Sequence, residues 1–497
     1  MTALAAPPAA ARNGTTVALT VIAGTVMIPL DVTVVAVALT RLAEETGASL
    51  PVIQWVSTGY TLALATVIPA AAWAIARYGA RSVFLAAIGV FTVGSVLVAT
   101  AWDAPSLIAF RVVQGLGGGF VMPAAMTLAL RSAPPADRGR VMSLLGLPIL
   151  VGPVLGPPLG GWLLDTLSWR WIFLVNLPIG LFALWLGRRN LPALPGDRTA
   201  RLDRTGLLLL APAMALLVLG TSLAEGSLVE ARALVPIGVG LVLLGAFARH
   251  ALRRTAPLLK VRLLGVRATG GGALLLVLFA GGYFSTLVLV PLFFQVARGE
   301  SATATGLLMV PQAVLAGISI QVAGRLIDRV PPIRVIATGI TLAVIGYGGF
   351  TLQMAADASY WTLVPLLALG TTGAGATMLP TITQATRDLD DADIPSGSTM
   401  INVLNQLATS VTTAAVAVLL TGQLSSRLPR LAGGIGDLRG LSPAARAAVS
   451  PEVSEAVRTA FLLPVGMMAL ALVVAFTVLW PRGGRTVAQG ARSTTLT

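Results

Sequence analysis

Fourteen stretches of about 20 apolar residues recur along the chain, and they restrict its fold more than any other feature. Each is long enough to cross a lipid bilayer as a helix. Only 11% of the 497 residues are charged, whereas soluble domains have about 25%. We therefore expect an all-α polytopic membrane protein. The runs fall near 17–39, 52–75, 82–101, 105–130, 141–164, 171–187, 205–222, 233–248, 270–296, 304–327, 333–354, 361–384, 396–420 and 459–480.

Basic residues alternate between the two sides of these runs. Of the 34 basic residues, 24 lie in the two tails or in loops after even-numbered runs, and nine lie in loops after odd-numbered runs. Lysine and arginine accumulate in cytoplasmic loops, so the pattern predicts that both tails are cytoplasmic. It also accounts for the net charge of +14 without a nucleic-acid partner. The acidic loop 387–393 is an exception, but acidic residues contribute little to orientation.

The order of the runs predicts a domain organisation. A six-helix bundle over 17–190 and a second one over 269–480 are separated by a linker, 191–268, which carries runs 7 and 8. Residues 1–16 and 481–497 form the tails. A cleaved signal peptide is the alternative for the first run, but its length and the internal Asp31 favour a retained span. Two six-helix halves are typical of duplicated transporters that work by alternating access.

Several classes of chemistry are disfavoured by the composition. Cysteine is absent, and the chain has one histidine, His250, and one lysine, Lys260. A cysteine or histidine metal site is therefore not expected, and no Walker A motif exists around the lysine. We expect no cofactor and no enzymatic activity, and an ion gradient is the expected energy source. The dominance of arginine indicates a bacterial genome of high GC content.

The stretch GPVLGPPLGG (152–161) places glycine and proline inside the fifth run. Gly152, Gly156 and Gly160 form one stripe along a helix, which lets a neighbouring backbone approach closely. The prolines, Pro157 among them, should bend the helix. The pattern predicts a seam that forms and releases, and simple tight packing is the alternative.

A few polar residues interrupt the apolar runs. A central aspartate costs about 2.5–3.5 kcal/mol on insertion scales, so Asp31 is a candidate for carrying a proton or contacting substrate. Arg111 remains charged at physiological pH, so it can assist Asp31 but cannot release a proton. Gln114 lies nearby in the sequence, and Asp165 is a weaker candidate near the end of run 5. The alternatives are a structural aspartate, a structural ion pair and an interfacial cap.

Aromatic and amide side chains in run 9 could line a cavity for a drug-sized molecule. Ordinary packing or lipid contact is the alternative for this set. The candidates are Phe279, Tyr283, Phe284 and Gln295.

The pattern GxxxGPxxGG, with Gly152, Gly156, Pro157, Gly160 and Gly161, resembles the antiporter motif of the major facilitator superfamily. The segments LDVTVVAVAL, WVSTGYTLALA, LIAFRVVQGLGGG and SWRWIFLVNLPIG resemble its branch of fourteen-span drug:proton antiporters. The resemblance covers essentially the whole chain. It implies the major facilitator fold with two extra central helices. It also associates the fifth-span motif with exporters and assigns Arg111 to proton coupling.

The sequence departs from this family at its gating loops. The loop after span 2 usually carries an aspartate, where this chain has Ala76, although Arg77, Gly79 and Arg81 remain. The second half keeps a version of the motif, GRLIDRVPPIR, with Asp328 and Arg329. Ala36 and Thr40 replace the asparagine and proline that are usual in span 1. The charge-based latch of the family is therefore in doubt in the first half.

The sequence thus predicts proton-coupled efflux of hydrophobic or amphiphilic small molecules across the cell membrane by a monomer. Its expected partners are the substrate, protons and the lipid bilayer. An uptake symporter of the same fold and a non-transporting sensor or scaffold are the alternatives. The charge of the substrate is not determined, because no carboxylate lies in spans 9–13 except Asp328 at a helix end.

Overall fold

The computed structural model describes residues 14–134, 137–193, 195–223, 231–300, 302–327, 329–390, 393–428 and 443–479, and all regular structure within these ranges is helical. The first six spans are built from α1 (Gly14–Thr25), α2 (Met27–Thr46), α3 (Leu50–Val67), η1 (Ile68–Ala70), α4 (Ala71–Tyr78), α5 (Ala80–Ala99), α6 (Ala104–Ser132), α7 (Arg138–Leu145), α8 (Leu147–Thr166), α9 (Arg170–Leu174) and α10 (Asn176–Asn190).

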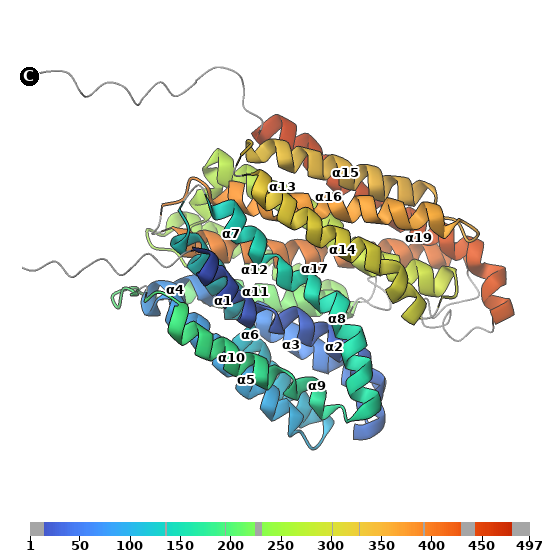
Figure 1. Cartoon of the computed structure of the whole chain (residues 1–497), viewed down its shortest axis with the longest axis horizontal. Helices are drawn as coiled ribbons and strands as arrows, with labels where there is room; N and C mark the ends of the chain where they lie inside the picture. Colours follow the sequence, from blue (N-terminus) through green and yellow to red (C-terminus); the bar gives the residue numbers. More distant parts are fainter. Residues whose placement is uncertain are drawn as a thin grey trace, which may run out of the picture.

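The remaining spans form the central pair and the second half (Figure 1). The central elements are α11 (Arg204–Leu223), α12 (Ala231–Arg253) and η3 (Val261–Gly265). The second half comprises α13 (Arg267–Leu292), η4 (Phe293–Ala297), α14 (Ala302–Leu326), α15 (Pro332–Leu352), α16 (Tyr360–Thr386), α17 (Ile394–Arg427), α19 (Pro443–Val474) and η5 (Ala475–Leu479).

The chain is a multi-pass membrane protein. Thirteen of its described helical stretches are long and apolar enough to cross a membrane. Helix α8 stands at the place of the fifth expected span, with 20 residues and Asp165 as its one charged residue. A helix of that length extends about 30 Å, and the count of fourteen spans stays a prediction.

The fifth span is interrupted outside the stretch where the prolines are expected to bend it. The helix continues without interruption through residues 152–161, where the prolines lie, and the break falls at Gly146 between α7 and α8. Pro148 follows that break at the start of α8, where proline is tolerated because the first helical N–H groups have no intrahelical partner. The first span is likewise interrupted, at Val26 between α1 and α2.

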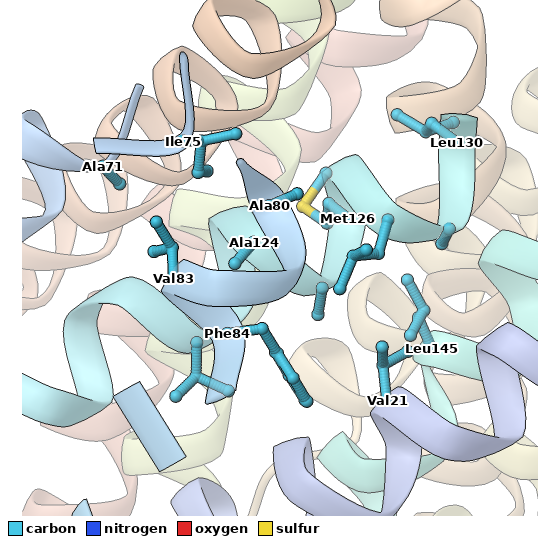
Figure 2. Packing of buried hydrophobic residues seen from close by; sticks show 14 of the residues in the cluster. Val21, Ala71, Ile75, Ala80, Val83, Phe84, Ala124, Met126, Leu130 and Leu145 are labelled. Carbon is cyan, nitrogen blue, oxygen red and sulfur yellow. The ribbon is translucent and has the colours of Figure 1, made fainter. Parts of the chain in front are cut away.

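The two halves pack together at the end of the bundle where the arginine-rich loops lie, here called the basic end (left in Figure 1). One buried apolar cluster joins helix ends from both halves. Ala80 starts α5, Leu130 lies near the end of α6, and Val141 lies in α7, whereas Ile394 starts α17 of the second half. Figure 2 shows part of this cluster from the first half. The halves are therefore closed against each other at the basic end.

The buried clusters near the opposite end do not join the halves in the same way. One contains Leu42 of α2, Ala99 of α5 and Ala104 of α6, and all its buried members come from the first six spans. Another contains Phe293 and Phe350 with residues of the second half alone. Among the described residues, the apolar closure between the halves therefore lies at the basic end.

The central pair contacts both halves. Helix α11 packs against α3 of the first half and against α17 of the second. A buried cluster contains Met214 of α11, Phe247 of α12 and Ile68 of η1 together with Val403 of α17. The inserted spans therefore lie along the boundary between the two halves.

The linker after α12 is fastened at two neighbouring points. The carboxylate of Asp203, just before α11, accepts hydrogen bonds from the backbone N–H groups of Gly206 and Leu258 at 3.0 and 3.1 Å. The backbone N–H of Lys260 donates to Ser396 Oγ at 2.9 Å, and its Nζ donates to the Asp393 carboxylate. The linker therefore ties the start of α11 to the start of α17.

Candidate functional site

Asp31 lies at the centre of a buried polar network in the first half. One of its oxygens, Oδ2, accepts a hydrogen bond from Arg111 Nη1 at 2.6 Å. The other, Oδ1, accepts from Gln114 Nε2 at 2.9 Å and from Asn176 Nδ2 at 3.0 Å. Gln114 Nε2 also lies 2.7 Å from Ser95 Oγ. All five side chains are buried, so α2, α5, α6 and α10 meet around one carboxylate.

Arg111 has further partners that carry no charge. Its Nε donates to the backbone oxygen of Val56 at 3.1 Å, and its Nη1 donates to Gln114 Oε1 at 2.7 Å. The guanidinium carbon lies 4.3 Å from the ring centroid of Tyr60 and 5.6 Å from that of Phe173. Aromatic faces attract a cation within about 6 Å, so the guanidinium is stabilised from several sides.

Glycines allow the helices to approach closely enough for these contacts. A Cβ at Gly115 would lie 2.5 Å from the backbone oxygen of Tyr60, and one at Gly119 would lie 2.6 Å from that of Leu64. A Cβ at Gly94 would lie 2.7 Å from the Cα of Gln114. Gly115 and Gly119 are spaced i, i+4 on α6, so they clear one face of this helix. This face brings α3 close enough for Val56 to reach Arg111.

The network contains one negative and one positive charge in a region without solvent contact. Removing both charges from water is costly, and their attraction offsets this cost only when the remaining polar atoms are satisfied. Two atoms at the periphery of the network have no partner among the described residues, Asn176 Oδ1 and Tyr60 Oη. Loss of either charge alone typically costs about 3–5 kcal/mol, because the other is left uncompensated.

The glycine stripe of α8 packs against α2, the helix that carries Asp31. A Cβ at Gly152 would lie 2.6 Å from the Pro29 oxygen, and one at Gly156 would lie 2.0 Å from Thr33 Oγ1. The Thr33 hydroxyl donates to the Gly152 oxygen at 2.9 Å, which joins the two helices. Gly160 faces Val34, whereas a Cβ at Gly161 would have nothing within 4 Å. The predicted close approach is confirmed at positions 152, 156 and 160.

The loop after the second span contacts the end of α10 and the linker that follows it. Arg77 donates to the backbone oxygens of Arg198 and Ala200 at 2.7 and 2.9 Å, and Arg81 donates to that of Arg188 at 2.5 Å. Gly79 has a φ of 83°, a conformation that favours glycine.

In the second half, the loop between α14 and α15 is described in part. Asp328 lies outside the described residues. Arg329 donates its backbone N–H to the Leu326 oxygen at 2.9 Å. The gating role of both loops stays a prediction.

The other predicted residues lie away from the network around Asp31. Asp165 is exposed at the last turn of α8. Phe279 is fully buried in the apolar cluster of the second half, which fits the alternative of ordinary packing. Tyr283 and Phe284 are half-buried with ring centroids 5.5 Å apart, and Gln295 is half-buried in η4. Their role in a cavity stays a prediction.

Sequence reasoning brought Asp31, Arg111 and Gln114 together but missed three other members of the site. Ser95 and Tyr60 give no local signal, because hydroxyl groups are common in membrane helices. Asn176 had a detectable signal, because it is an amide side chain within an otherwise apolar span. Among the described residues, no group of three histidine, cysteine or acidic side chains could hold a metal ion.

Comparison with known proteins gives consistent matches to membrane transporters. The model of the Major Facilitator Superfamily matches residues 21–413. The chain is 40% identical over 404 residues to a multidrug resistance protein B homolog of Mycobacterium tuberculosis, covering 80% of this chain and 75% of that protein.

Two solved structures share the fold at low sequence identity. The human organic anion transporter MFSD10 (TETRAN) superposes with a TM-score of 0.59 at 15% identity, over 93% of this chain and 97% of that one. The proton:xylose symporter XylE superposes with a TM-score of 0.60 at 13% identity, over 92% and 94%. These likenesses confirm the expected all-α fold with its two helical halves.

Proposed function

The chain belongs to the major facilitator superfamily, and from this premise we propose that it exports hydrophobic or amphiphilic small molecules in exchange for protons. The buried network around Asp31 carries this proposal. Its relative in Mycobacterium tuberculosis bears the name of a multidrug resistance protein, which supports drug efflux as the physiological role.

Asp31 is the proposed proton carrier. Among the charged groups of the network, Arg111 does not release a proton at physiological pH, so the carboxyl group is the one that can exchange. Protonation of Asp31 would remove the negative charge that pairs with Arg111. The guanidinium would then still have the Val56 and Gln114 oxygens and the Tyr60 ring as partners. The network can therefore hold the arginine in both protonation states of the carboxyl group.

The glycine seam offers a way to connect proton exchange to movement. Pro29 and Thr33 flank Asp31 on α2, and both contact the α8 stripe. A change in charge at Asp31 would act on the same helix that slides against α8. We propose that this coupling exposes the substrate site in turn at the basic end, which is closed here, and at the opposite end. We assign the basic end and both termini to the cytoplasm.

The energy of one proton is sufficient for useful export. A charge that moves across 100 mV releases about 2.3 kcal/mol, and about 1.4 kcal/mol corresponds to a tenfold concentration ratio. One proton per neutral substrate therefore supports a gradient of roughly 40-fold. In this scheme the protein acts as a monomer in the cell membrane, needs no cofactor and performs no covalent chemistry.

The test is transport driven by a pH gradient in proteoliposomes, with internal pH followed by a dye. Asp31→Asn should abolish both proton movement and uphill transport but leave substrate binding. Asp165→Asn, which changes an exposed carboxylate in the same half, is the matched control and should behave like the parent. An Asp31→Asn variant that still concentrates substrate and moves protons at the parental rate would show that another group carries the proton. Substrate movement in the same direction as protons would instead indicate a symporter.

A further inference from the structure

One face of α17 is polar along the middle of the membrane. Successive residues turn by about 100° around a helix, which places six positions between residues 398 and 413 within one sector about 100° wide. All six are uncharged polar residues. This polar face consists of Ser398, Asn402, Asn405, Gln406, Thr409 and Thr413.

Contacts of the neighbouring faces determine which way the polar face points. Val403 and Leu407 pack with the central pair. Thr412 and Ala408 lie against Gly281 of α13. Val411 is exposed on a further side. The polar face is thus directed neither at the central pair nor at α13.

A direct contact relates this face to the first half. Asn402 Nδ2 lies 3.2 Å from the sulfur of Met126 on α6, a contact between the two halves. Figure 1 shows α17 running between the labelled helices of the two halves. The polar face therefore lies at the boundary where the halves meet.

Burial changes along the face in a way that suits a binding surface. Ser398, nearest the basic end, is buried, whereas the five positions from 402 to 413 are half-buried. The Oδ1 atom of Asn405 is buried and has no hydrogen-bond partner among the described residues. An unsatisfied buried acceptor typically costs about 1–3 kcal/mol. Such a cost is removed when a ligand supplies the missing donor.

We infer that the polar face of α17 recognises the substrate and that it selects uncharged molecules carrying hydrogen-bond donors and acceptors. This inference rests on the proposed function and specifies its substrate class. Amide and hydroxyl groups both donate and accept, so the face can pair with amide, carbonyl and hydroxyl groups. No charged residue lies on α17 before Arg427 at its end. In the first half the charges of Asp31 and Arg111 compensate each other. Neither the polar face of α17 nor the network around Asp31 therefore favours a charged ligand.

Chloramphenicol is a suitable probe, because it is uncharged and has one amide and two hydroxyl groups. Its equilibrium binding to the purified full chain in detergent, without a pH gradient, should weaken at least tenfold in Gln406→Leu and in Thr409→Val. Thr409→Val keeps the side-chain shape and removes one hydroxyl, so it remains informative if the first variant does not fold. Thr412→Val makes the same change on the α13 side of the helix and should bind within twofold of the parent.

A second measurement exploits the absence of cysteine from the chain. In a Thr409→Cys variant, saturating chloramphenicol should slow alkylation by N-ethylmaleimide at least tenfold. In Thr255→Cys, at the exposed basic end, it should have no effect.

Several results would overturn the inference. They are absence of chloramphenicol binding by the parent, parental affinity in both polar-face variants, and alkylation at position 409 that chloramphenicol does not slow. Binding needs no gradient, so failure of proton-coupled export with intact, variant-sensitive binding would contradict the proposed function alone. Normal export with variant-insensitive binding would contradict only the assignment of the polar face.

Discussion

Alanine substitutions at three glycines of α8 should have graded effects that follow their distances to α2. At Gly152 the added Cβ would lie 2.6 Å from the backbone oxygen of Pro29, whereas ordinary contact begins at 3.4 Å. The helices must therefore separate by about 0.8 Å, since a backbone atom cannot rotate away. Overpacking of this kind costs about 1–3 kcal/mol.

The same series gives an effect of similar size at the next position and none at the last. At Gly156 the added Cβ would lie 2.0 Å from Thr33 Oγ1 and 2.7 Å from Thr33 Cβ, which side-chain rotation cannot move, so the helices must separate there by about 0.7 Å. Rotation of the hydroxyl away from the new methyl group would also lose its hydrogen bond to the Gly152 oxygen. Such a bond contributes about 0.5–1.5 kcal/mol. At Gly161 a Cβ would meet nothing within 4 Å. Gly161→Ala should be neutral or stabilising, because alanine favours a helix over glycine by about 0.5–1 kcal/mol.

Transport should follow the same order, since Asp31 lies between Pro29 and Thr33. A shift of about 0.8 Å is enough to lengthen the 2.6 Å contact between Asp31 and Arg111 beyond that of a charge-assisted hydrogen bond. Misplacement by about 1 Å can cost roughly 100-fold in rate, so Gly152→Ala should lose at least tenfold.

The assay combines apparent melting temperature in detergent with pH-driven transport in proteoliposomes at matched protein amounts. The reasoning is refuted if Gly161→Ala is as harmful as Gly152→Ala, or if Gly152→Ala transports at the parental rate.

Three further predictions concern other parts of the molecule. Arg111→Lys should reduce transport at least tenfold, because an ammonium cannot reach the separate partners of Nε and Nη1; parental rates in proteoliposomes would contradict this. Thr255→Cys should resist an impermeant thiol reagent added outside intact cells, whereas Thr100→Cys should react, and the reverse pattern would invert the topology. Burial raises the pKa of Asp203, but hydrogen bonds from Gly206, His250 and Leu258 outweigh it and lower the pKa. Its stabilising effect is therefore complete above the unfolded value, about 3.9, and is lost as the pH falls through the lower folded value. Asp203→Asn should reduce the melting temperature more at pH 7 than at pH 3, and an equal reduction at both would refute this.

The positions of most spans and the packing of α8 could be predicted from the sequence because they depend on local patterns. Runs of about 20 apolar residues give the spans, and the spacing of Gly152, Gly156 and Gly160 gives a common face. The break at Gly146 could not be predicted from the composition of 152–161, because neighbouring helices decide where a membrane helix tolerates proline.

The site could be predicted only in part. Charged residues such as Asp31 and Arg111 stand out in an apolar span because their burial is costly. Ser95 and Asn176 join them through tertiary contacts between helices distant in sequence. The polar face of α17 was hidden inside a run that reads as apolar on average, and only its contacts with neighbouring helices show its direction.

The double attachment of the linker limits how the molecule can open at its basic end. Leu258 is bonded to Asp203 at the start of α11, and Lys260 is bonded to Ser396 at the start of α17. Only Leu259 separates these two anchors, and two fully extended residues span at most about 7 Å. This short segment cannot stretch further, so one of the two sets of bonds must break when the starts of α11 and α17 move apart. If both hold, the start of α11 travels with the start of α17, and opening of the basic end must instead break the bonds from Arg77 to Arg198 and Ala200 that hold the segment before α11 to the first half.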